Sequence, residues 1–455
     1  MTRMFAKSPV IAAVLFCAII WRGEDALAQR EGPADQGVRV GITYAPGTLP
    51  GLLFLGSGRG VFLDSVRAIL RRDLDYSDRF EMITIPGNEF LEIAGLVEGG
   101  SAPLSEDEAG SVANYALYAA LRVDFALDVS KSPDSGAAVT LFDVRGAAVR
   151  RRLTVENGDV ESLEFRANVH RLSDAVVLAA TGTPGIATSR LLFVRRGRLY
   201  RVDSDGAGVT GIAASGNVYS PTWHPEGKDF AYASFPGDSR VRIGSLDGES
   251  GDAHLIIAGV DGTQDFAPAF SPNGVTIVFA RAGAEGTDIF SYNLADSCCL
   301  QRLTVGRFSD NLSPTFSPDG RQIAFVSTRP GSPQIYVMGS DGTGAELFAP
   351  FDFGVTGNSY APEWSPDGLN IAFHREIGGS PQVFVMDVSS RTVKQLSSAG
   401  RNEDPTWGPD GRHLAYVSSR TGSSQIWVID LETGRIRQVT RMGRVRLPSW
   451  SSRLD

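Results

Sequence analysis

The chain has 455 residues, which is too long for one ordinary hydrophobic core and predicts two domains. Glycine (51 residues) and proline (24 residues) are abundant and charged residues make up 21%, a composition typical of a turn-rich β protein and not of a disordered chain. The net charge of -9 argues against a nucleic-acid partner, because phosphate binding needs a basic face.

The first 28 residues have the pattern of a secretory signal peptide. Arg3 and Lys7 are basic, the 12 residues from Val10 to Trp21 form an apolar core, and small residues precede the cleavage site at Ala28. We therefore expect residues 1–28 to be removed near Ala28, export to the periplasm, and a mature N-terminal extension over residues 29–37. The alternative is an uncleaved membrane anchor, although the apolar core is too short to cross a hydrocarbon layer of about 30 Å.

Residues 38–183 carry no repeat and alternate between strand and helix patterns, which predicts a compact α/β domain. The segment 61–74 has a helical period, with Val61, Val66 and Ile69 on its apolar side and arginines on the other side. Further helices are predicted over 109–120 and 162–180, and strands over 38–43, 52–55, 80–83, 123–129, 138–143 and 152–155.

One unit recurs through the remainder of the chain, most clearly as Ser313-Pro314-Thr315-Phe316-Ser317-Pro318-Asp319-Gly320. Its aromatic residue gives a short strand its core contact, and Ser-Pro-Asp-Gly predicts a type I turn that reverses the chain. Each unit continues with three more strand patterns, as in a β-propeller blade. The first prolines are separated by 43 to 48 residues, a period typical of stacked or radial arrays, and are Pro221, Pro268, Pro314, Pro362, Pro405 and Pro448.

The first repeat is incomplete, because residues 191–213 supply three strands with no Pro-x-Trp strand before them. The missing strand matches Leu447-Pro448-Ser449-Trp450-Ser451 near the other end of the chain. If it pairs beside 191–194, six blades of four strands close the ring and leave no exposed edge. The predicted fold is α+β with two domains: an N-terminal α/β domain over 38–183, then a six-bladed β-propeller over 186–455 closed by the C-terminal strand.

No catalytic motif is present: the sequence lacks Gly-x-Ser-x-Gly, His-Glu-x-x-His, the phosphate-binding loop and Cys-x-x-Cys. The propeller histidines, which include His224, His374 and His413, occupy non-equivalent positions of the repeat. The segment 203–206 has part of a calcium-loop pattern without its distal glutamate, and we interpret it as a turn. We expect no catalytic residue, no cofactor and no metal. A metal-dependent propeller lyase or lactonase is the alternative, and it would need His and carboxylate ligands that converge in the channel.

Cys298 and Cys299 are the only cysteines after the predicted signal peptide, so we expect no disulfide framework. Because neighbouring residues of a strand face opposite sides, one of the two is predicted to be buried for packing and the other exposed.

The order of these features resembles the TolB family, the periplasmic component of the bacterial Tol-Pal cell-envelope system. Residues 66–74 with Ser77-Asp78-Arg79-Phe80 are similar to the family's helix-into-strand segment, and residues 121–127 are similar in position to its Gly-Ile-Asp-Ala-Val-Val pattern. Residues 447–451 resemble the family's C-terminus, and the resemblance covers nearly the whole mature chain.

This resemblance implies a monomeric interaction protein without catalysis, peripheral to the envelope, that supports outer-membrane integrity and cell division. It implies that the propeller binds the peptidoglycan-associated lipoprotein Pal and that the mature N-terminus contacts the inner-membrane protein TolA. The charged extension 29–37 precedes the first strand, where the family often starts almost at that strand, so the TolA contact stays open. The family's Pal-binding positions match residues that include Gln264, Asp265, Asn311 and Leu312.

We place the predicted partner-binding surface in the loops that enter the Pro-x-Trp strands, at one rim of the propeller's central channel. Such loops can vary without disturbing the strands beneath them. The alternative is that these residues only form turns. They mix amides, carboxylates and aromatic rings, as interface anchors do, and are Tyr219, Gln264, Asp265, Phe266, Asn311, Leu312, Asn358, Tyr360, Asn402 and Glu403.

Overall fold

The structure is a computed structural model that describes residues 49–56, 58–84, 115–133, 136–214, 216–235, 240–245, 254–255, 260–306, 309–348 and 357–454. The predicted signal peptide (1–28), the extension (29–37), the strand over 38–43 and residues 109–114 of a predicted helix lie outside these ranges. All described residues belong to the unit from Tyr44 to Asp455. None of the helices among them is long and apolar enough to cross a membrane.

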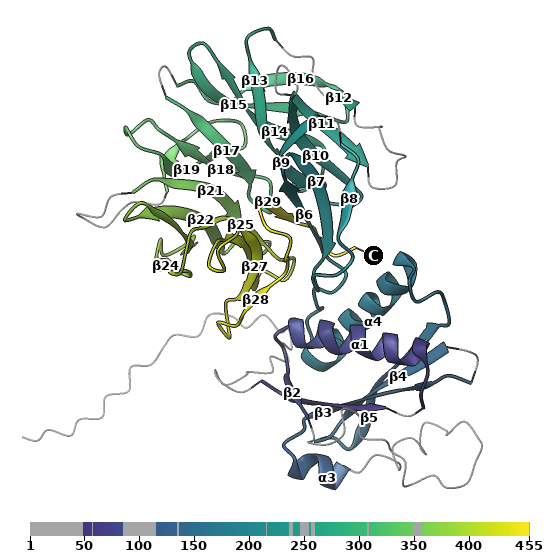
Figure 1. Cartoon of the computed structure of the whole chain (residues 1–455). Coiled ribbons are helices and arrows are strands. Elements are labelled where there is room, and N and C mark those ends of the chain that lie inside the picture. The colour runs from purple at the N-terminus through teal and green to yellow at the C-terminus, as the bar shows by residue number, and fades with distance from the viewer. Residues whose placement is uncertain are drawn as a thin grey trace, which may run out of the picture. The chain divides into compact units, whose positions relative to one another are not determined.

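The N-terminal described part is a five-stranded sheet with helices on both faces (Figure 1). The strand order is β2-β1-β3-β4-β5, with β1 parallel to β2 and β3 and the other pairs antiparallel. The strands are β1 (Gly51–Gly56), β2 (Glu81–Ile83), β3 (Phe125–Lys131), β4 (Gly136–Asp143) and β5 (Ala148–Glu156). The helices are α1 (Val61–Tyr76), α3 (Tyr115–Ala120) and α4 (Leu163–Thr181).

Alternation along β1 divides the core of this domain between the two faces of the sheet. Leu52 and Phe54 pack in the cluster that contains the buried sides of α1 and α4, which lie side by side in Figure 1. Leu53 packs instead in the cluster that contains Tyr118 of α3. The Ser162 hydroxyl caps the N-terminus of α4 by accepting from the Phe165 amide at 3.1 Å, as serine side chains commonly do.

The C-terminal part consists of six four-stranded antiparallel sheets, the blades of a propeller. The first blade contains β9 (Asn217–Trp223), β10 (Asp229–Phe235), β11 (Arg240–Ser245) and β12 (His254–Leu255), and the second contains β13 (Gln264–Phe270), β14 (Thr276–Gly283), β15 (Gly286–Asn293) and β16 (Cys298–Arg302). The third contains β17 (Asn311–Phe316), β18 (Gln322–Ser327), β19 (Gln334–Gly339) and β20 (Glu346–Leu347), and the fourth contains β21 (Ser359–Trp364), β22 (Asn370–Ile377), β23 (Ser380–Asp387) and β24 (Val393–Gln395). The fifth contains β25 (Asn402–Trp407), β26 (His413–Ser418), β27 (Gln425–Asp430) and β28 (Ile436–Gln438).

The sixth blade joins both ends of the propeller and confirms the predicted closure. It is built from β29 (Val445–Trp450), β6 (Arg190–Arg195), β7 (Arg198–Asp203) and β8 (Thr210–Ile212), in that order. Trp450 pairs with Leu191 and Ser449 with Leu192. The inner strands contact one another in the cycle β9, β13, β17, β21, β25, β29 and back to β9. The predicted six-bladed fold is therefore confirmed.

Each inner strand carries a β-bulge at the residue before its first proline. That residue has a φ of 45° to 52° in all six blades, a left-handed conformation that is uncommon for residues other than glycine. Proline fits a bulge because it has no amide hydrogen to donate to the ladder. Opposite each bulge lies a fully buried aromatic side chain of the second strand: Phe193, Tyr232, Phe279, Phe325, Phe373 or Tyr416.

The cysteine pair differs from the expectation of one buried and one exposed thiol. Cys298 and Cys299 form a disulfide with each other; Cys298 is half-buried and Cys299 is exposed. The pair starts the outer strand β16 at a register shift opposite Asn293, and Cys299 has a φ of 66°. The local backbone therefore does not alternate as a regular strand does, which is why the prediction from alternation was wrong.

Candidate interaction surface

The predicted partner-binding residues lie at the entrance to the inner strands. Because the six blades repeat one topology, these entrances gather at one end of the ring, which we call the rim. The position two residues before each bulge proline carries a half-buried side chain in five blades, Tyr219, Phe266, Leu312, Tyr360 and Glu403, and the exposed Arg446 in the sixth. The Arg446 guanidinium lies 5.1 Å from the centre of the Tyr219 ring, which links two neighbouring blades across the rim.

Three of the predicted residues, Asp265, Asn311 and Asn402, are almost completely buried. Asp265 accepts two hydrogen bonds from the Arg281 guanidinium, at 2.6 and 2.9 Å. The Asn402 amide donates to the Gln382 side chain at 2.9 Å. These side chains fix the rim loops from beneath, whereas Gln264 is exposed and Asn358 is half-buried. Direct partner contact by any of the ten residues stays a prediction.

A layer of arginine side chains supports the rim and was missed by the sequence analysis. In four consecutive blades an arginine lies over two aromatic rings of the second and third strands, with its guanidinium carbon 4.8 to 5.7 Å from each ring centre. Stacking of this kind is attractive because the cation faces the negative ring surface. The sequence signal is an arginine two or four residues after the second-strand aromatic, and the four are Arg281, Arg329, Arg375 and Arg420.

Two half-buried carboxyl groups, Glu363 and Asp404, and the half-buried His374 lie on the inner and second strands of the β21 and β25 blades. Glu363 accepts hydrogen bonds from the Thr406 hydroxyl and the Trp407 amide, both at 3.0 Å, and burial raises its pKa to about 7. Burial likewise raises the pKa of Asp404 to about 6. Burial lowers the pKa of His374 to about 4, so this histidine is neutral at pH 7 and accepts from the Asp404 amide at 3.2 Å.

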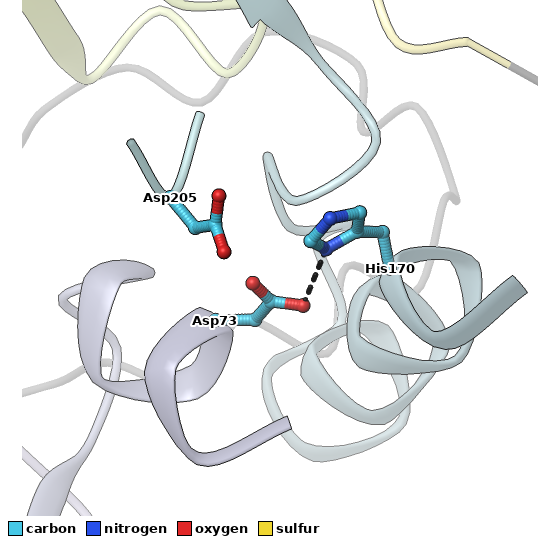
Figure 2. Close-up of side chains that lie close together, drawn as sticks. All are labelled: Asp73, His170 and Asp205. Carbon is cyan, nitrogen blue, oxygen red and sulfur yellow. Dashed lines mark hydrogen bonds and ion pairs between the residues drawn. The ribbon is translucent and has the colours of Figure 1, made fainter. Parts of the chain in front are cut away.

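A second polar cluster joins α1 and α4 to the turn after β7 (Figure 2). The His170 imidazole donates to the Asp73 carboxylate at 2.8 Å, and Asp205 lies beside them. One ligand atom from each of these three residues lies within 4.8 Å of the others, a geometry compatible with a metal site. Burial acts to lower the pKa of His170, but the Asp73 and Asp203 carboxylates overcome it and raise that pKa to about 10.

The charges in this cluster are already compensated by protein groups. Arg166 donates to Asp205 at 3.0 Å and to Asp203 at 3.3 Å, and Arg72 lies 3.2 Å from Asp205. A metal ion would have to compete with these guanidinium groups and with a charged His170. The donor set therefore fits an ion-pair contact between the α/β domain and the propeller better than a metal centre. The predicted turn over 203–206 is present, with the Gly206 amide donating to the Asp203 carbonyl at 2.8 Å.

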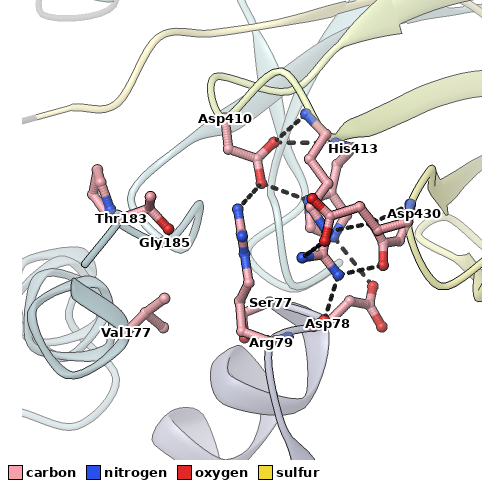
Figure 3. A network of polar contacts seen from close by, with 12 residues as sticks. Ser77, Asp78, Arg79, Val177, Thr183, Gly185, Asp410, His413 and Asp430 are labelled. Carbon is pink, nitrogen blue, oxygen red and sulfur yellow. Dashed lines mark hydrogen bonds and ion pairs between the residues drawn. The ribbon is translucent and has the colours of Figure 1, made fainter. Parts of the chain in front are cut away.

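A third cluster connects the end of α1 to the β25 blade (Figure 3). The His413 imidazole lies between Asp410, at 2.8 Å, and Asp78, at 3.2 Å. Arg412 donates to the Asp78 carbonyl at 2.6 Å and pairs with Asp430. Burial acts to lower the His413 pKa, but hydrogen bonds to Asp410 and Asp78 raise it overall. Asp78 belongs to the helix-into-strand segment of the sequence resemblance, so this segment supplies one of the contacts between the α/β domain and the propeller.

The comparisons with known proteins agree on one family. Residues 178–350 and 353–455 match the family described as "TolB beta propeller domain". The curated Tol-Pal system protein TolB of Bordetella pertussis is 27% identical over 287 residues, which cover 60% of this chain and 59% of that protein. The namesake of Bordetella parapertussis is 29% identical over 209 residues, covering 43% of this chain and 46% of that protein. This chain thus covers less than two thirds of the length of these relatives.

A solved structure supports the fold over a larger part of the chain. The crystal structure of TolB from Acinetobacter baumannii matches with a TM-score of 0.71 and 22% sequence identity, over 90% of this chain and 98% of that one. At this level of identity the match shows a shared fold and nothing about partners.

Proposed function

Because this chain belongs to the TolB β-propeller family, we propose that it is a periplasmic adaptor of a Tol-Pal system that binds the peptidoglycan-associated lipoprotein Pal through the rim of its propeller. In this role it contributes to outer-membrane integrity and cell division without catalysing a reaction. Its mature N-terminus is the proposed contact for a TolA-like inner-membrane protein. The curated relatives carry the name of the same system, which supports the assignment.

The rim is the observation that carries the proposal. Tyr219, Phe266, Leu312 and Tyr360 occupy the same half-buried position in four consecutive blades. Aromatic and aliphatic side chains of this kind are common anchors in protein interfaces, where a few residues supply most of the binding free energy. The buried amides, Asp265 and the arginine layer beneath them hold the loops in place, so little conformational entropy is lost when a partner docks.

The direct test is a pull-down from detergent-solubilised envelope, using the mature chain (29–455) with a tag after Asp455. We expect a lipoprotein with a peptidoglycan-binding domain to be recovered and identified by mass spectrometry. Titration calorimetry with that purified lipoprotein would then measure the affinity. If a folded chain recovers no such lipoprotein and shows no heat of binding with it, the adaptor assignment is wrong.

A further inference from the structure

A cavity of about 630 Å³ lies next to the cluster of Figure 2, between α4 and the propeller. Its wall is formed by α4, the segment before β6, strands β6 and β7, the turn between β9 and β10, and residues 452–454. This volume is in the range of small-molecule sites, which is roughly 300 to 1,000 Å³. The cavity is separate from the rim, where the proposed lipoprotein binds, because none of the ten predicted rim residues lines it.

The lining of this cavity is strongly basic, although the chain as a whole carries a net charge of -9. Only two carboxylates, Asp203 and Glu226, line it, together with the charged His170. Asp203 already pairs with Arg166 and with a lining arginine, Arg190. The basic side chains in the wall are Arg171, Arg190, Arg201, Lys228 and Arg453.

Within the part of the chain that the structure describes, three of these cations form no ion pair with a carboxylate, although Arg453 lies near enough to Asp174 to interact with it electrostatically. Arg171 donates to the Asn168 side-chain carbonyl at 2.5 Å. Arg453 donates to two backbone carbonyls, those of Gly185 at 2.7 Å and Pro184 at 3.3 Å. The ammonium group of Lys228 is exposed and makes neither a hydrogen bond nor an ion pair with a described residue. The three cations come from α4, the turn between β9 and β10 and the segment 452–454, and all three line the same cavity.

We propose that this cavity is a binding site for a small multivalent oxyanion, of the kind presented by a phosphate or diphosphate group. Guanidinium and ammonium groups around a concave wall attract such anions, and charge-assisted hydrogen bonds to phosphate oxygens are the stronger ones in proteins. A ligand held by Arg171 of α4 and by Lys228 of the propeller contacts both domains. Its binding therefore stabilises the contact between them, since a ligand of the folded state raises apparent stability.

The test uses pyrophosphate as the probe and the full mature chain at low ionic strength. We expect saturable binding by titration calorimetry and a rise in melting temperature. Arg171→Ser together with Lys228→Ser should weaken binding at least tenfold. Glu226→Gln removes a repulsive carboxylate and should strengthen binding a few-fold. The matched control is Lys394→Ser with Arg441→Ser, which removes two exposed cations away from the cavity and should leave the affinity unchanged.

Two results overturn the proposal. The first is absence of binding at millimolar pyrophosphate. The second is an equal loss of affinity in the control pair, which would indicate unspecific charge attraction. All substituted side chains are exposed, and circular dichroism of each variant checks that it is folded. Co-sedimentation with phosphatidylglycerol vesicles distinguishes a lipid headgroup from a free anion, because only the former retains the protein on vesicles. Lipoprotein binding by the Arg171→Ser and Lys228→Ser variant should be unchanged, so this site and the rim are tested independently.

Discussion

The indole nitrogen of Trp450 donates a hydrogen bond to the Ser189 hydroxyl at 2.8 Å, which joins the last inner strand to the segment that leads into β6, the second strand of the same blade. The Trp450 side chain is 6% exposed and packs with Leu191, Phe193 and Val202. Together with the pairing of β29 and β6, this contact closes the ring.

Trp450→Ala should therefore destabilise the propeller strongly. Truncation of a buried large aromatic side chain costs about 3 to 5 kcal/mol, against a total stability of roughly 5 to 15 kcal/mol for a protein domain. Chemical denaturation should show a lower midpoint, and deletion of residues 447–455 should abolish cooperative unfolding. Val209→Ala, at a side chain that is 44% exposed, is the control and should change little. A wild-type midpoint in Trp450→Ala would show that the blades close in another way.

The double variant Phe266→Ala and Tyr360→Ala should weaken binding to the cognate lipoprotein by at least roughly 2 kcal/mol, the scale of an interface hot spot. Both rings are half-buried at the rim and neither lies in the blade of β29 and β6 that closes the ring, so the fold should persist. Titration calorimetry on the folded variant measures the effect. Wild-type affinity would remove the rim from the proposed interface.

Glu363 should make the stability of the propeller depend on pH. Its pKa rises from 4.5 to about 7 on burial, so the folded state favours the protonated carboxyl group. Its contribution to stability is greatest below pH 4.5 and falls as the pH rises towards 7, because the unfolded chain then ionises more readily. Glu363→Gln keeps a carbonyl acceptor without the charge and should stabilise the protein at pH 8 by roughly 2 to 3 kcal/mol. Denaturation curves at pH 5 and pH 8 check this, and an equal effect at both values would contradict it.

Asp78→Ala should uncouple the α/β domain from the propeller. The Asp78 carboxylate lies 2.9 Å from Arg435, 3.3 Å from Arg437 and 3.2 Å from His413, so its removal takes away the ion pair of Arg437, whereas Arg435 keeps Asp75 and His413 keeps Asp410. Loss of one member of a buried ion pair costs about 3 to 5 kcal/mol, and the carboxylates that remain should reduce this cost. Differential scanning calorimetry should then resolve a separate, earlier transition for the α/β domain. Asp64→Ala, at an exposed carboxylate of α1, is the control and should keep the wild-type profile.

The sequence predicted ring closure because its first repeat, residues 191–213, has three strands and no inner strand. Residues 447–451 supply one inner strand with no further strands after it. The sequence could not predict which rim side chains are buried. The bulge places Ala267 and Pro268 opposite the single residue Phe279, so the inward and outward alternation counted from Phe270 changes before it reaches Asp265. Simple alternation along the strand would place Asp265 on the exposed side, whereas the bulge turns it into the interior.

The contacts between the domains were also beyond sequence reasoning. Arg72 and Asp205 are 133 positions apart, and Asp78 and His413 are 335 positions apart. No local period or spacing relates such pairs, because their meeting depends on how two complete domains pack. The weak calcium-loop pattern at 203–206 marked the correct turn, yet its aspartates bind arginine and histidine side chains supplied by α1 and α4.

The pairing of β29 with β6 also determines the order in which the propeller can be completed. Ser189 and Trp450 are 261 positions apart, so the edge of β6 stays bare while all the intervening blades are synthesised. Closure over such a separation slows folding, and a bare strand edge accepts any matching strand. The β29 of a neighbouring copy matches it as well as the chain's own does. Concentrated, half-folded chains should therefore exchange this strand and form swapped dimers, whereas dilution favours the closed monomer.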